Sequence, residues 1–194
     1  MPSQTNRRRQ TRCSINTGVL VACICALFVV PSRSRADEQS HVRTESTYIQ
    51  AVLAEATQRS STVSALIERI QASNVIAHLE CGRFKSLTLQ GRTLFLVATS
   101  GVRYVRVQID CGLVRPDLMA SIGHELQHVA EIANAPDVVD QPSFARLLHR
   151  IGFSRSGTPD DEYETEAGLL AKERVSREIS TRRSVSTRVA SRQD

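Results

Sequence analysis

The sequence predicts an α+β fold in which N-terminal helices, a small antiparallel sheet and further helices follow one another along the chain. Apolar residues recur at helical spacing across residues 45–79, where residues 60–62 (Ser-Ser-Thr) are expected to separate two helices. Residues 86–98 and 102–110 are rich in Val, Leu, Phe and Tyr, and the second of these segments alternates apolar with polar residues, as a half-buried strand does. Helical spacing returns after residue 116 and continues toward the C-terminus.

The first 36 residues have the pattern of an export signal. Several arginines lie between residues 7 and 12, and Val19–Val30 is an uninterrupted apolar run, shorter than the roughly 20 residues that a membrane-spanning helix needs. Residues 34–36 (Ser-Arg-Ala) fit a signal-peptidase site, so we expect cleavage after Ala36, a periplasmic or secreted product and no stable membrane insertion. An uncleaved anchor and lipidation at Cys23 are the alternatives, although the apolar run continues past Cys23.

The expected mature chain divides into a compact domain, residues 37–175, and a basic tail, residues 176–194. The tail is rich in Ser, Thr and Arg and is expected to be disordered. The full chain carries a formal net charge of +5, but residues 1–36 contain six arginines and no acidic residue. The mature chain would carry 19 basic and 20 acidic residues, so its charge gives no reason to expect a nucleic-acid partner.

Two cysteines, Cys81 and Cys111, remain once the expected signal is removed. An even pair in an exported domain predicts one disulfide, with two buried free thiols as the alternative. The loop that such a disulfide closes, about 30 residues, implies a stabilisation of roughly 3–4 kcal/mol in the chain-entropy description.

The chemistry of the sequence is concentrated in the helix expected from about Pro116 to Asn134, which contains the pentad His124-Glu125-Leu126-Gln127-His128. Residues i and i+4 of a helix lie one above the other on the same face, so His124 and His128 can bind one metal ion. Glu125 lies near that face, where it can accept a proton from water. This H-E-x-x-H pattern resembles that of zinc-dependent peptidases.

A catalytic zinc usually has three protein ligands, so a third must come from elsewhere in the chain. The metzincin pattern needs a Gly and a His where this chain has Glu131 and Asn134, which excludes that class. The gluzincin pattern, similar to E-x-x-A/S-D on a later helix, is matched by Glu164 and Ala167. Gly168 stands where the gluzincin family has an Asp that orients a metal-bound histidine.

A second pattern overlaps the first. Residues 157–164 match the aspzincin pattern G-T-x-D-x-x-Y-G in all but the last place, which would make Asp160 the third ligand. Residues 158–161 (Thr-Pro-Asp-Asp) also fit the start of the last helix, where the helix dipole favours an acidic residue without any metal. Since that explains Asp160, we favour Glu164 as the third ligand and keep Asp160 as the alternative.

The chain as a whole resembles small exported gluzincin-like metallopeptidases of the minigluzincin type. The resemblance implies a zincin-like fold, a Zn²⁺ cofactor, and hydrolysis of a peptide or protein substrate with Glu125 as general base. An edge strand within residues 94–99 would pair with the extended substrate. A non-catalytic metal-binding or structural protein that keeps the fold is the alternative. The candidates for the group that stabilises the transition state are Tyr104, His149, Arg150 and Tyr163.

Overall fold

The computed structural model describes residues 40–85, 89–154 and 163–190, and for residues 182–190 it describes the backbone alone. The expected export signal, its cleavage site after Ala36 and the alternative ligand Asp160 lie outside these residues. A search of the described residues finds no helix with the length and apolar character needed to cross a membrane.

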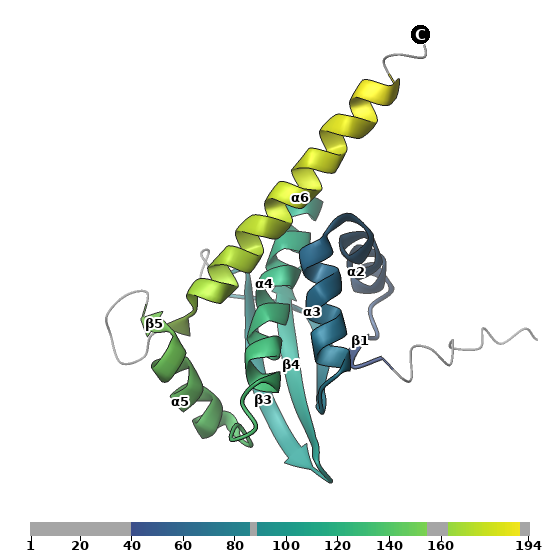
Figure 1. The fold of residues 1–194 in the computed structure, drawn as a ribbon. Helices are drawn as coiled ribbons and strands as arrows, with labels where there is room; N and C mark the ends of the chain where they lie inside the picture. The colour runs from purple at the N-terminus through teal and green to yellow at the C-terminus, as the bar shows by residue number, and fades with distance from the viewer. Residues whose placement is uncertain (1–39, 86–88, 155–162, 191–194) are drawn as a thin grey trace, which may run out of the picture. The chain divides into compact units, whose positions relative to one another are not determined.

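The predicted α+β class is confirmed (Figure 1). The described residues form five helices, a four-stranded mixed sheet and a two-stranded sheet. In chain order the elements are β1 (Val42–Thr44), α2 (Thr47–Arg59), α3 (Ser61–Gln71), β2 (Val75–Gly82), β3 (Gly91–Thr99), β4 (Val102–Asp110), α4 (Arg115–Ala133), α5 (Gln141–Ile151), β5 (Phe153–Ser154), β6 (Tyr163–Glu164) and α6 (Glu166–Ala190).

The two N-terminal helices meet at Ser60, as predicted. The Ser60 side chain accepts a hydrogen bond from the Val63 amide at 3.1 Å and so caps the start of α3. The prediction of helix over residues 45–79 is wrong only at its end, because α3 ends at Gln71 and β2 begins at Val75. Val75, Ala77 and Leu79 are buried, which is the alternation of a strand with one face toward the core.

The four-stranded sheet has the order β1-β2-β4-β3 and is mixed, whereas an antiparallel sheet was predicted. Only β3 and β4 pair antiparallel, while β1 with β2 and β2 with β4 are parallel. The hairpin turn between β3 and β4 uses Ser100 and Gly101, both with positive φ, as a two-residue turn of type I′ requires. After β2 the chain crosses to the edge, forms β3 there and returns through this turn, so β4 lies between β3 and β2.

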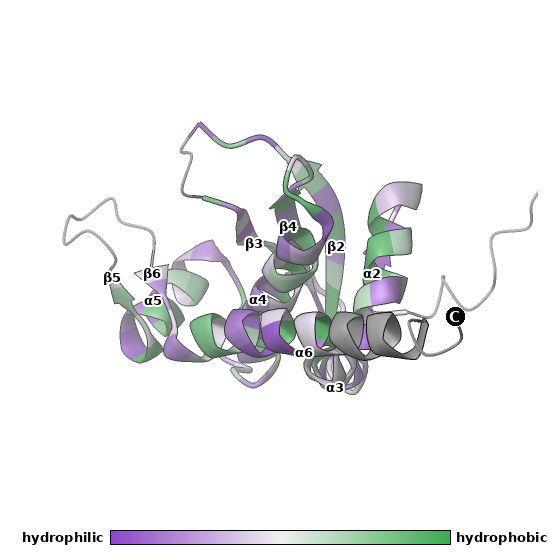
Figure 2. Ribbon diagram, turned by 90° about the horizontal axis from the view of Figure 1, so that it is seen from above, coloured by the Kyte–Doolittle hydropathy of each residue, from purple (hydrophilic) through white to green (hydrophobic). Residues whose placement is uncertain are grey.

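Helix α4 occupies the centre of the domain. It packs against the sheet on one side and against α3 and α6 on the other, and Figures 1 and 2 show α6 crossing it. Most of its side chains are therefore buried, including Leu118, Ile122, Leu126 and Ile132. Buried apolar residues lie before, within and after the predicted pentad, so the packing of the whole helix holds the two histidines in place.

A buried arginine fastens the C-terminal end of α4 to the sheet. Arg103 on β4 donates to the carbonyl oxygens of Ile132 and Ala135, both at 2.7 Å, and to Asn74 Oδ1 at 2.7 Å. The last carbonyls of a helix have no partner within the helix. The guanidinium adds a charged donor to carbonyls that also accept from turn amides, Ile132 from Ala135 and Ala135 from Val138. Burial lowers the pKa of Arg103, against the opposing effect of the Asp137 charge.

Replacing Arg103 with Met is expected to lower the free energy of unfolding by about 3 kcal/mol, because several buried carbonyls lose a charged donor. Urea unfolding followed by circular dichroism measures the change. Arg106→Met is the matched control: Arg106 lies on the same strand, and its side chain is 43% exposed. Equal losses in the two variants would contradict the role assigned to Arg103.

The predicted disulfide is present between Cys81 and Cys111. Cys81 lies near the end of β2, and Cys111 directly follows β4. These strands are parallel neighbours, with Cys81 beside Ile109, so the disulfide joins the two strands at their C-terminal ends. The disulfide therefore fixes the central pair of strands, on which α4 packs.

Helix α6 continues well past the domain boundary expected after residue 175. Ile179 is buried, and Glu178 accepts hydrogen bonds from the side chains of Ser60, Ser61 and Thr62 at the start of α3. The expected disorder is not seen for residues 176–190, which are helical. Among residues 176–181 only Ile179 is buried, so this part of α6 packs along one side.

Candidate metal centre

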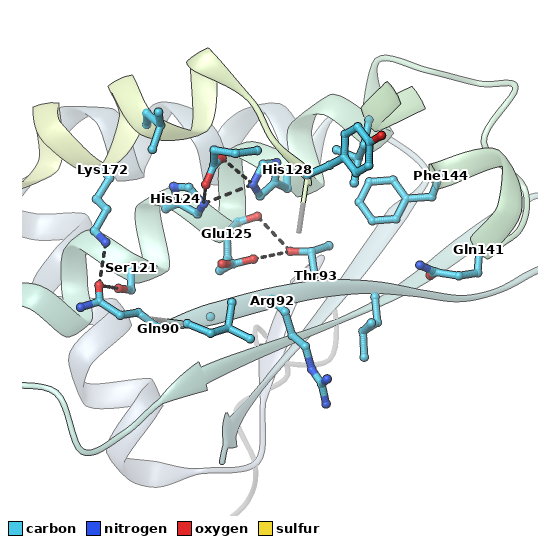
Figure 3. Close-up of a pocket in the computed structure, with 17 residues that line it drawn as sticks. Gln90, Arg92, Thr93, Ser121, His124, Glu125, His128, Gln141, Phe144 and Lys172 are labelled. Atoms are coloured by element: carbon cyan, nitrogen blue, oxygen red, sulfur yellow. Dashed lines mark hydrogen bonds and ion pairs between the residues drawn. The ribbon is translucent and has the colours of Figure 1, made fainter. Parts of the chain in front are cut away.

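Helix α4 places His124 and His128 side by side. It begins at Arg115 and ends at Ala133, close to the predicted bounds, with the pentad in its middle. The two rings are one helical turn apart, with centroids 4.8 Å from each other, and their Nε2 atoms are separated by 3.2 Å. Both rings face the same cavity (Figure 3).

Glu164 joins the two histidines, as predicted, but it does so from a different element. It lies in β6, which pairs with β5, and α6 begins only at Glu166. The expectation that the last helix already includes Glu164 is therefore wrong. Its Oε2 atom is 3.2 Å from His124 Nε2, and its Oε1 atom is 3.4 Å from His128 Nε2.

These distances fit a single bound metal ion. Ligand atoms held by one tetrahedral zinc at 2.0–2.1 Å are separated from each other by roughly 3.3 Å. Each separation measured here, 3.2, 3.2 and 3.4 Å, is close to that spacing, although each histidine faces a different oxygen of Glu164. With one ligand atom taken from each residue, the three atoms all lie within 4.8 Å of one another. His124, His128 and Glu164 thus form a group that could hold a metal ion. Two imidazole nitrogens and one carboxylate oxygen are also a donor set found in catalytic zinc sites.

The charges of the cluster also favour a cation. Burial opposes a charge on His128, but the carboxylates of Glu131 and Glu164 outweigh it and raise the pKa of His128 to about 10. Burial likewise opposes the charge on Glu164, but hydrogen bonds with His124 and His128 hold its pKa well below the ordinary range. The carboxylates of the cluster therefore stabilise a positive charge placed between them and the histidines. A metal ion and a proton would compete for the lone pairs of the imidazole nitrogens and the Glu164 carboxylate.

A carboxylate that the sequence reasoning did not identify orients His128. Glu131 Oε2 lies 2.9 Å from His128 Nδ1, and its other oxygen accepts a hydrogen bond of 2.8 Å from Thr165 Oγ1. With Nδ1 donating to Glu131, the Nε2 lone pair is directed at the metal position. The spacing of His128 and Glu131, i and i+3 on one helix, was a signal that could have indicated this pair. Among the described residues His124 Nδ1, by contrast, is buried without a hydrogen-bond partner.

Gly168, where the family pattern has Asp, lies against the metal cluster itself. A Cβ atom at this position would be 2.9 Å from Glu164 Oε1 and 3.1 Å from His128 Cε1. Such contacts are too short, so any larger residue would displace one of the ligands. In this chain Glu131 supplies the orienting carboxylate from α4, and Gly168 leaves room for the ligands.

If the cluster holds a metal ion, introducing the Asp of the gluzincin pattern by Gly168→Asp is expected to weaken its binding by about 10-fold or more. That is the range in which disturbed support of a ligand lies. Competition with a chromophoric chelator measures the affinity. Leu170→Asp places the same charge on a half-exposed position of α6 and is the control. Tighter metal binding by Gly168→Asp would contradict this expectation, because it would show that the site has room for an Asp at position 168.

Glu125 is buried beside the cluster, where a catalytic base is predicted. Thr93 Oγ1 on β3 donates to Glu125 Oε2 at 2.8 Å, which fixes the carboxylate (Figure 3). A Cβ atom on Gly91 would lie 2.6 Å from Glu125 Oε1, so the glycine makes room for this side chain. Burial raises the pKa of Glu125, against the opposing effect of the two histidines and Thr93.

A cavity of about 410 Å³ opens onto these residues, with walls from α4, β3, α5 and α6. Of the four candidates for a transition-state donor, Tyr163 lines the cavity. The His149 ring packs against the Tyr163 ring, with their centroids 3.9 Å apart. Arg150 instead pairs with Asp137 at 3.6 Å, and Tyr104 belongs to β4, outside the cavity lining.

The predicted edge strand is β3, but a different part of it borders the cavity. The lining of the cavity includes residues 91–94 of β3 and the preceding residues 89 and 90, whereas residues 94–99 were expected to pair with the substrate. The hairpin carries the later residues away toward its turn, and the pairing of β3 with β4 shifts between Phe95 and Val97.

Comparison of the chain with protein-family models, with curated proteins and with solved structures finds no match. The functional interpretation therefore depends on the geometry of the site.

Proposed function

We propose that this chain is an exported zinc-dependent metallopeptidase. The observation that carries the proposal is the cluster of His124, His128 and Glu164, whose ligand atoms all lie within 4.8 Å of one another and are a donor set found in catalytic zinc sites. Two further observations support it. Glu125 is fixed beside the cluster by Thr93, and an open strand edge borders the same cavity.

In the proposed mechanism, His124, His128 and Glu164 hold the zinc ion. When bound, zinc supplies a Lewis acid that makes water a stronger acid and polarises a carbonyl group. Glu125 accepts the proton of the attacking water and transfers it to the nitrogen of the leaving amine. Burial raises the pKa of Glu125, which makes its carboxylate a stronger base toward the water proton.

The edge of β3 offers backbone groups to an extended peptide. The carbonyl of Gln90 accepts a hydrogen bond from the Asp110 amide, so alternation along the strand directs the amide and carbonyl of Gly91 and Thr93 away from β4. The next outward amide, that of Phe95, donates to Gln141 Oε1 at 2.8 Å. A substrate strand can therefore pair with β3 at Gly91 and Thr93, next to Glu125, and Gln141 ends this stretch.

Export is part of the proposal. An intramolecular disulfide fits an oxidising compartment, where such bonds persist. The pattern of residues 1–36 supplies the second argument.

The proposal is tested by zinc analysis and peptide digestion. We expect the mature protein to contain one zinc per chain and to cleave peptides in a complex peptide mixture, as read by mass spectrometry. Chelation should remove the cleavage and added zinc should restore it. A Glu164→Ala protein purified in parallel controls for contaminating proteases. Zinc binding without any cleavage would favour the alternative, a non-catalytic metal-binding protein.

A further inference from the structure

The two ends of the cavity differ in chemistry (Figure 3). Near α5 the wall is largely aromatic and aliphatic, with Phe144, Leu148 and Tyr163. The other end has Lys172 together with Gln90 and Ser121. We propose that the Lys172 end binds a carboxylate of the substrate, either its C-terminal carboxylate or an Asp or Glu side chain. This inference rests on the proposed peptidase function and specifies the substrates that the site prefers.

The Lys172 ammonium has a neutral partner. Its Nζ atom lies 2.6 Å from Gln90 Oε1, and the same oxygen is 3.3 Å from Ser121 Oγ. An ammonium has three donors, so this contact leaves donors for a ligand. Within the part of the chain that the structure describes, no carboxylate forms an ion pair with Lys172.

The acids and the other cation of the cavity have partners already. Glu164 contacts both histidines, and Glu125 accepts from Thr93. Arg92 donates to Gln108 at 2.6 Å and lies over the ring of Phe84, and Figure 3 shows its side chain directed away from the metal cluster. Lys172 is therefore the cation placed to meet an anionic group that enters the cavity.

The distance from the metal cluster suits a peptide. Lys172 follows Gly168, the residue in contact with the cluster, by one turn of α6, and Ser121 precedes Glu125 by one turn of α4. One turn is about 5.4 Å along a helix, and an extended peptide advances about 3.3 Å per residue. A carboxylate bound by Lys172 would thus lie one or two residues from the bond that is cleaved.

The experiment measures binding in the zinc-loaded Glu125→Gln protein, with N-terminally labelled peptides and fluorescence anisotropy. One pair of peptides differs only in a free or amidated C-terminus. A second pair is amidated and differs only in one Glu or Gln. We expect the acidic member of at least one pair to bind about 10- to 100-fold more tightly, as for a charge-assisted hydrogen bond. The pair that responds identifies the source of the carboxylate.

Variants of Lys172 separate recognition from a structural role. Lys172→Met should abolish the preference for the acidic peptide, whereas Lys172→Arg should keep it. Lys85→Met is the matched control, because Lys85 is exposed and not part of the cavity lining. If Lys172 only linked α6 to Gln90, the Lys172→Met variant would have a lower free energy of unfolding. The ratio of its affinities for the acidic and the neutral peptide would stay at the wild-type value.

Equal affinities for both members of both pairs, a preference that persists in Lys172→Met, or no binding of any peptide would each overturn this inference. Because binding is measured without the catalytic base, the result is independent of cleavage. A wild-type protein that cleaves nothing would contradict the peptidase proposal, while the acid-to-amide ratio would still decide the role of Lys172.

Discussion

Replacing Glu125 with Gln is expected to lower kcat/KM for peptide hydrolysis by about 10²- to 10⁴-fold, the usual contribution of a general base. Gln has nearly the shape of Glu and can keep the hydrogen bond to Thr93, but it cannot accept the proton of water. Glu125 is not among the three predicted ligands, so the zinc content should stay at the wild-type level. The variant should therefore separate loss of catalysis from loss of metal.

Initial rates with a quenched fluorescent peptide and metal analysis of the same sample test this expectation. Glu173→Gln is the matched control, since it removes the same charge from an exposed position of α6. If Glu125→Gln retained most of the activity, the base would have to be another group. If it lost zinc as well as activity, Glu125 would act through the metal site, and the proposed division of roles would be wrong.

Replacing Glu164 with Ala is expected to weaken zinc binding by more than roughly 100-fold. Loss of a group that only supports a ligand can cost up to about 100-fold, and here a ligand itself is removed. The loss also leaves His124 and His128 without the carboxylate that their Nε2 atoms face. Asp160→Ala, which tests the alternative ligand, should change the zinc affinity by less than about 2-fold, as expected for a group outside the ligand set.

Competition with a chromophoric chelator measures both affinities, and thermal unfolding confirms that each variant is folded. Glu166→Ala is the control, because Glu166 is an exposed glutamate two residues from Glu164. The reverse result, with Asp160 required and Glu164 dispensable, would assign the chain an aspzincin-like ligand set.

Local patterns predicted the elements that depend on neighbours in sequence. The pentad helix follows from 3.6-residue periodicity, and the break at Ser60 follows from its capping side chain. Strand β2 was missed because its pattern is ambiguous. Val75, Ile76 and Leu79 fit a helix face, whereas Val75, Ala77 and Leu79 fit a strand face. Pairing with β1 and β4 decides between them, and that pairing depends on distant residues.

In the candidate site, too, the features set by neighbours in sequence could be predicted, and those set by distant residues could not. His124, Glu125 and His128 could be predicted together because one helix positions all three. The orienting role of Glu131 depends in addition on Thr165, which is 34 residues away. The start of α6 was misplaced because a capping pattern at residues 158–161 describes a local preference, while Glu164 is held in β6 by its pairing with β5.

The packing of α4 has a consequence for how metal is acquired. Zinc fingers fold only when metal binds, because their ligands are not assembled beforehand. Here the helix that carries both histidines is buried between the sheet and two other helices, and Arg103 holds its end. The protein therefore pays little ordering entropy when the ion arrives. In the proposed metallopeptidase, metal exchange and unfolding would therefore be separate events, and we expect the fold to persist when the ion is removed.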